Sequence, residues 1–137
     1  MRHDWTLLCT EVEPQEDGTI SLGNVMTSWI AVERERLAIS GETFPFEPPV
    51  LLVSQWAAEF ASDRRVHAAT IQMLGPGGEE VLWVDSLAID LRETTIFRIV
   101  YAIPSLKFEG WGLYEFHVYL DGTGPIGEWG RACLLVK

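Results

Sequence analysis

The segment Gly110–Gly122, GWGLYEFHVYLDG, alternates between two kinds of side chain over most of its length. Successive side chains of a β-strand point to opposite faces, so this alternation predicts a strand. Asp121-Gly122 follows as a turn signal, because glycine accepts the positive φ that tight turns require. One face of the predicted strand is wholly apolar, and we expect it to be buried. It consists of Tyr114, Phe116, Val118 and Leu120.

The other face of this strand is the candidate binding face. It mixes apolar, acidic and titratable side chains, so it is either open to water or covered by a partner. A tryptophan between two glycines precedes it, in a turn-like setting where an aromatic side chain can contact a ligand or another protein. Packing over the end of the fold is the alternative role for that tryptophan. The candidate face consists of Trp111, Leu113, Glu115, His117 and Tyr119.

A strand-like period also runs through the rest of the chain. Val66–Met73 and Val81–Leu91 alternate in the same way. Ile96–Ile103 is apolar on both faces apart from one arginine, as expected of a central strand covered on both sides. Glycine-rich turn signals, such as GPGG at 75–78, separate the runs.

This pattern predicts an all-β fold. Strands at this spacing, about eight in number, favour a two-sheet antiparallel β-sandwich. The chain has 137 residues, which suits one domain, so we expect residues 1–137 to form a single β-sandwich domain.

One segment allows two interpretations. Ser54–Arg65, SQWAAEFASDRR, places two aromatic residues four apart among alanines, as a short helix would. The competing interpretation makes Val50–Glu59 a strand that enters a hairpin at Ser62–Arg65. The apolar run VLLV at its start and the strand pattern after it favour the hairpin.

Prolines interrupt the strand pattern at two places. Thr43–Pro49, TFPFEPP, contains three of them and cannot donate a full ladder of hydrogen bonds. We expect a loop or a protected sheet edge there. For the same reason, Pro104 is expected to end the apolar run before it.

The charge balance excludes some classes of partner. The chain has 20 Asp and Glu against 10 Lys and Arg, a formal net charge of −10, which disfavours nucleic acids and anionic membrane surfaces. The N-terminus lacks the apolar run of about 7–15 residues that a secretory signal requires. No stretch approaches the roughly 18 apolar residues of a membrane span. We therefore expect a cytoplasmic protein that binds neither nucleic acid nor membrane.

No motif predicts catalysis, a cofactor or a metal site. The chain lacks a G-x-S-x-G nucleophile elbow, a C-x-x-C pair and an H-E-x-x-H sequence. Asp121 is the nearest approach to a calcium ligand, and support of its own turn by a side-chain–backbone hydrogen bond is the favoured role. Cys9 and Cys133 lie near opposite ends of the chain. A bridge between them is one interpretation, and two buried free thiols are the favoured one.

Three stretches resemble one family of proteins. These are WTLLCTEVEPQEDGTISLGNV near the start, DRRVHAATIQMLGPGGEEV and GLYEFHVYLDG. They are similar to a family of small, uncharacterised, single-domain bacterial β-sandwich proteins, a domain of unknown function. This chain departs from the family pattern at Thr10, Asn24 and Gly77. The resemblance implies a β-sandwich and supplies no activity, substrate or catalytic residue.

Two functions from different classes remain after these exclusions. The first is a non-enzymatic β-sandwich module that acts through protein contacts with a partner or with itself, as a homo-oligomer. The second is a small-ligand or carbohydrate-binding sandwich that uses exposed aromatic residues and a carboxylate. It would require these groups to converge on one concavity. Its candidate residues are Trp111, Tyr114 and Tyr119, with Glu115 or Asp121.

Overall fold

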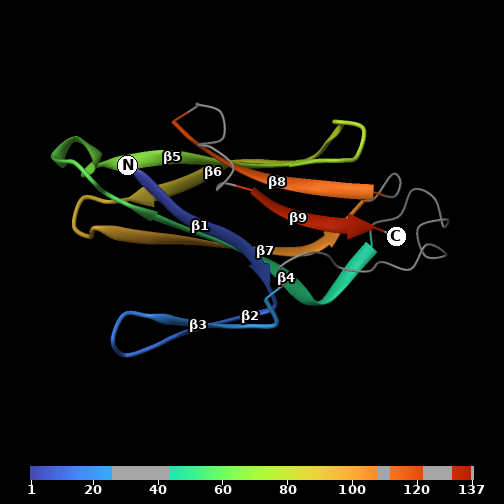
Figure 1. Cartoon of the computed structure of the whole chain (residues 1–137), viewed down its shortest axis with the longest axis horizontal. Helices are drawn as coiled ribbons and strands as arrows, with labels where there is room; N and C mark the ends of the chain where they lie inside the picture. Colours follow the sequence, from blue (N-terminus) through green and yellow to red (C-terminus); the bar gives the residue numbers. More distant parts are fainter. Residues whose placement is uncertain (26–43, 108–111, 122–130, 137) are drawn as a thin grey trace.

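A computed structural model describes residues 1–25, 44–107, 112–121 and 131–136 of the protein (Figure 1). Apart from one short 3-10 helix, the elements in these residues are all β-strands, so the predicted all-β class is confirmed. In chain order they are β1 (Arg2–Cys9), β2 (Glu11–Pro14), β3 (Ile20–Gly23), β4 (Phe44–Ala57), the helix η1 (Ala61–Asp63), β5 (Val66–Leu74), β6 (Glu80–Asp90), β7 (Ile96–Leu106), β8 (Gly112–Leu120) and β9 (Arg131–Val136).

The strands form two larger sheets and one hairpin, with antiparallel pairing throughout. One sheet has the order β1-β4-β7 and the other has the order β6-β5-β8-β9. The two sheets lie face to face, with β1 beside β9 and β6 beside β7 (Figure 1). This arrangement confirms the predicted sandwich. No helix in the described residues is long and apolar enough to cross a membrane.

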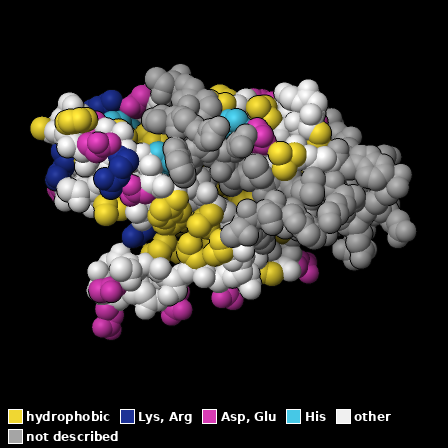
Figure 2. Space-filling model, viewed as in Figure 1, with side chains coloured by type: hydrophobic (Ala, Val, Ile, Leu, Met, Phe, Trp, Pro, Cys, Tyr) yellow, Lys and Arg dark blue, Asp and Glu magenta, His cyan; other side chains and the backbone are white. Residues whose placement is uncertain are grey.

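The third sheet is the β2–β3 hairpin, which the sequence did not distinguish from the sandwich. The guanidinium of Arg98 in β7 donates to the carbonyl oxygen of Gly18 in the hairpin turn, at 3.1 Å. The hairpin therefore reaches over the side of the three-stranded sheet that faces away from the main core. Figure 2 shows hydrophobic side chains gathered between the hairpin and the body of the molecule.

The main core lies between the two larger sheets. The predicted inward face of β8 is confirmed, because all four of its side chains are buried. Alternate residues of β5 from Ala69 to Met73 are buried as well, and Leu52 and Trp56 of β4 meet them from the opposite sheet. Period-two patterning thus builds the core from both sides.

The prediction for Ile96–Ile103 was wrong in one respect. This segment is part of β7, which lies at the edge of its sheet among the described strands, and β4 lies between β1 and β7. Ile99 and Ile103 are buried in the core, whereas Ile96 and Val100, on the opposite face, are exposed. Apolar residues are common on exposed protein surfaces. The apolar residues on both faces of this strand therefore did not mean that both faces are buried.

The three prolines of residues 43–49 and Pro104 lie inside strands. β7 continues past Pro104 to Leu106, so the prediction that this proline ends the run was wrong. The pairing of β4 with β7 shifts register between Pro45 and Val50, and Pro104 lies opposite this irregular stretch. A bulge leaves ladder positions without hydrogen bonds, so it can accommodate residues that have no N–H group. β1 pairs with β4 only as far as Leu51, so among the described strands the proline-rich end of β4 has no partner on that side, in keeping with the expected sheet edge.

The structure corrects both interpretations of the segment Ser54–Arg65. β4 runs as a strand to Ala57, so the helical interpretation is wrong for the first part of the segment, whereas the 3-10 helix η1 (Ala61–Asp63) supplies a helical turn in the second part. The predicted hairpin is also wrong, because β4 and β5 belong to different sheets. The carboxylate of Asp63 accepts hydrogen bonds from the amides of Glu59 and Phe60, each at 3.0 Å. These bonds stabilise the loop that connects β4 in one sheet to β5 in the other.

Candidate functional site

The predicted binding face lies on the outer side of the four-stranded sheet. Leu113, Glu115, His117 and Tyr119 occupy alternate positions of β8, opposite in phase to the buried residues. Leu113 is 42% exposed, and the other three are partly buried. The structure thus brings these four together on one face, whereas Trp111 lies outside the described residues.

A line of hydrogen bonds crosses this face from β8 to β6. The hydroxyl of Tyr119 donates to the side-chain oxygen of Gln72 in β5. The side-chain nitrogen of Gln72 donates in turn to Glu80 Oε1 in β6, at 3.1 Å. The polar groups of three neighbouring strands are therefore connected, and they are held in fixed orientations.

His117 is bonded along its own strand. Its Nε2 lies 3.1 Å from Glu115 Oε2, and its ring stacks on that of Tyr119 with 6.2 Å between the ring centres. A carboxylate only accepts hydrogen bonds, so Nε2 carries the hydrogen and Nδ1 is the acceptor in the neutral ring. Nδ1 is buried and has no hydrogen-bond partner within the described residues.

Trp83 belongs to this face and was missed from the sequence. Trp83 lies in β6 and is 50% exposed. It pairs with Gln72 in β5, which pairs with His117 in β8, so the three residues form one row across the sheet. The sequence did contain a signal that Trp83 faces outward. Trp83 is two positions from the charged Asp85, and residues two apart in a regular strand lie on the same face. We call Trp83, Leu113, Glu115, His117 and Tyr119, with Gln72 and Glu80, the outer face.

The residue set of the ligand-binding alternative does not converge in the structure. Tyr114 is fully buried on the inward side of β8, and Tyr119 is on the outward side. Asp121, at the end of β8, contacts β5 and the residue just before it. Its Oδ1 accepts from the amide of Ala68 and its Oδ2 accepts from Arg65, both at 3.0 Å. Asp121 therefore joins two strands, where we had expected it to support its own turn.

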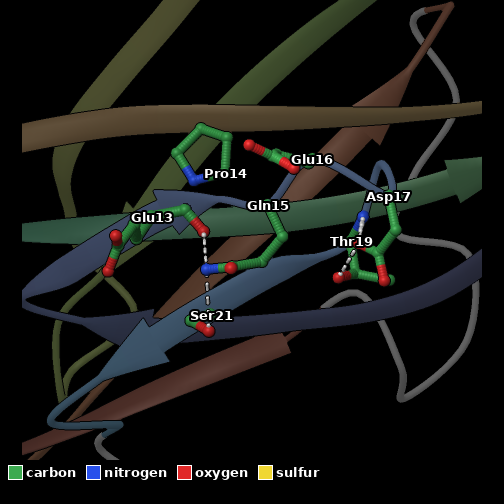
Figure 3. A pocket seen from close by; sticks show the side chains of 7 residues that line it. All are labelled: Glu13, Pro14, Gln15, Glu16, Asp17, Thr19 and Ser21. Atoms are coloured by element: carbon green, nitrogen blue, oxygen red, sulfur yellow. Dashed lines mark hydrogen bonds between the residues drawn. The ribbon is translucent and has the colours of Figure 1, made fainter.

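The structure also contains a hollow, away from the outer face, in the β2–β3 hairpin (Figure 3). Asp17 accepts from both the hydroxyl and the amide of Thr19, and these bonds lower the pKa of its carboxyl. The side-chain amide of Gln15 donates to the carbonyl oxygen of Glu13 and to Ser21 Oγ. These polar groups are engaged in shaping the hairpin. The hollow is lined by Glu13, Pro14, Gln15, Glu16, Asp17, Thr19 and Ser21.

The remaining candidates for chemistry concern thiols and metals. Cys9 is a buried free thiol, as expected, and burial raises its pKa. The side chain of Cys133 lies outside the described part of the structure. Within the residues that are described, no group of three or more His, Cys, Asp or Glu is placed to hold a metal ion.

Comparison with known proteins yields no relative. No protein-family model, curated protein or solved structure matches this chain, so its resemblance to the bacterial β-sandwich family stays a prediction.

Proposed function

We propose that this protein is a non-enzymatic β-sandwich module that binds a protein partner through the outer face. The observation that carries the proposal is the half-exposed Trp83, which shares this face with the half-exposed Leu113. Large aromatic side chains contribute most of the binding energy at many protein interfaces. Tryptophan also combines a broad apolar surface with an N–H donor that a partner can satisfy.

The polar groups of the outer face suit a preorganised interface. Tyr119, Gln72 and Glu80 are already bonded to one another, so less side-chain freedom is lost when a partner binds. A sheet face presents such groups over an area, which fits a protein surface better than a small molecule that must be enclosed.

Charge favours a cationic partner over a second copy of this chain. Glu80 and Glu115 lie on the same face as Trp83, and the whole chain has a formal charge of −10. An arginine or lysine could stack on the Trp83 ring while it approaches these carboxylates. Two copies meeting through this face would bring carboxylates together. The proposed partner is therefore a basic segment of another protein.

The proposal can be tested with basic peptides and two matched variants. The probe is an arginine-rich peptide, with a peptide in which glutamate replaces every arginine as its control. We expect the basic peptide to perturb the NMR signals of Trp83 and His117, and we expect Trp83→Ser to weaken binding by about 2 kcal/mol, roughly 30-fold. Val100→Ser is the matched control, because Val100 is 49% exposed on the other sheet.

Three results would count against the proposal. Equal weakening by both variants would show that the outer face is not the binding surface. Equal binding of the acidic peptide would remove the argument from charge. Light scattering that shows a dimer disrupted by Trp83→Ser would replace the basic partner with a second copy.

A further inference from the structure

A buried histidine at the end of the sandwich lies between two hydrogen-bond acceptors. His67 is 3% exposed and lies on the inward side of β5. Its Nε2 is 2.8 Å from the carbonyl oxygen of Asp63, in η1. A carbonyl oxygen can only accept a hydrogen bond, so Nε2 carries a hydrogen.

The other ring nitrogen faces a carboxylate. Nδ1 of His67 is 2.8 Å from Asp121 Oδ2. Partial burial opposes the ionisation of Asp121, but hydrogen bonds from His67, the Ala68 amide and Arg65 together lower the pKa of its carboxyl. An ionised carboxylate has no hydrogen to donate, so Nδ1 carries a hydrogen as well. A nitrogen lone pair at this distance from the carboxylate would be repelled.

We infer that His67 is held as a buried imidazolium ion, which ties the connection between β4 and β5 to the end of β8. One ring contacts η1 on one side and the residue after β8 on the other. Both hydrogen bonds use the charged form of the ring, and such charge-assisted bonds are stronger than neutral ones. Removal of either ring hydrogen leaves one contact without a hydrogen bond in a buried place, which is costly.

The charged groups around this ring come from three directions. Asp121 faces it from the end of β8, and Arg65 shares the same carboxylate oxygen from the start of β5. The carboxylate of Asp63 lies on the η1 side and accepts from the amino group of Met1 at 2.6 Å. On β6, the residue paired with His67 is the apolar Ile89. The Asp121 carboxylate therefore balances the imidazolium charge by direct contact.

The direct test is long-range ¹H–¹⁵N NMR of the histidine rings in the whole protein. We expect both nitrogens of His67 to carry hydrogen at pH 7, and a ring with one hydrogen at this pH would overturn the inference. Asp121→Asn removes the charge and allows the side chain to donate to Nδ1, so His67 should become neutral in that variant.

Asp90→Asn is the matched control, since Asp90 also pairs with an arginine, Arg92, and does not contact His67. In that variant both ring nitrogens of His67 should keep their hydrogens. If the control neutralises the ring as Asp121→Asn does, the link to Asp121 is wrong. If Asp121→Asn does not fold, the spectrum of the unmodified protein still decides whether the ring is an imidazolium.

Discussion

Trp56 Nε1 donates a hydrogen bond to Ser54 Oγ at 2.8 Å, and both side chains are fully buried between the two larger sheets. This bond is the first in a chain of side-chain hydrogen bonds that runs from β4 to β1. Ser54 Oγ lies 2.8 Å from Thr6 Oγ1, which lies 2.7 Å from His3 Nε2. If each hydroxyl donates to the next group, every bond is satisfied and His3 Nε2 is the final acceptor.

Loss of the Ser54 hydroxyl should destabilise the protein by about 1–3 kcal/mol, because Ser54→Ala leaves the Trp56 N–H buried without an acceptor. Urea denaturation measures this difference. Ser86→Ala is the control, since Ser86 is exposed and its loss should change stability by less than about 0.5 kcal/mol. Equal effects of the two substitutions would show that the buried hydrogen bond contributes little.

The position of His3 at the end of this hydrogen-bond chain predicts that the stability of the protein depends on pH. Burial lowers the pKa of His3, and a smaller opposing effect comes from the nearby Asp4 carboxylate. The unfolded chain therefore binds a proton that the folded protein excludes, so this contribution is present above about pH 6.5 and is lost as the pH falls below it. In His3→Gln, which retains an acceptor for Thr6, that part of the pH dependence should disappear.

Urea denaturation should compare the unmodified protein with His3→Gln at each pH between 5 and 8, roughly the range in which histidine titrates. A stability difference that stays constant over this range would contradict the prediction for His3.

The two faces of β8 should respond differently to truncation. Phe116 is fully buried, so Phe116→Ala should cost about 3–5 kcal/mol through lost burial and the cavity that remains. Leu113 belongs to the outer face, so Leu113→Ala should cost less than about 1 kcal/mol. The measurement is the free energy of unfolding in urea, and a larger cost at Leu113 would reverse the assignment of the two faces.

Asp63 should titrate at an unusually low pH. The amino group of Met1 and the amides of Phe60 and Glu59 donate to its carboxylate and, against a small effect of burial, lower its pKa to about 2. The folded pKa lies below the usual 3.8, so the stabilisation is present above pH 3.8 and is lost as the pH falls to about 2. Carboxyl ¹³C NMR should locate the titration near pH 2.

Asp63→Asn provides the comparison for acid unfolding, because its amide oxygen can still accept hydrogen bonds but carries no charge. The unmodified protein should lose its advantage over this variant between pH 4 and pH 2, roughly the span from the usual aspartate value to the shifted one. Parallel acid unfolding of the two proteins would contradict this account of Asp63.

The sequence by itself determined the strands and the faces of several of them. Alternation along β8 identified both its buried face and four of the residues on its outer face, because strand geometry sends neighbouring side chains in opposite directions. Strand phase also contained the signal that Trp83 faces outward. These features depend on residues close together in the chain, so a local pattern could reveal them.

Only the tertiary structure decided which strands are neighbours and what covers each face. The sequence could not show that Ile96 and Val100 of β7 are exposed, since an apolar face looks the same in sequence whether a sheet or solvent lies over it. Nor could it show that His67 meets Asp121, 54 positions away. That contact depends on the pairing of β5 with β8, and such long-range pairing follows from the packing of the whole fold.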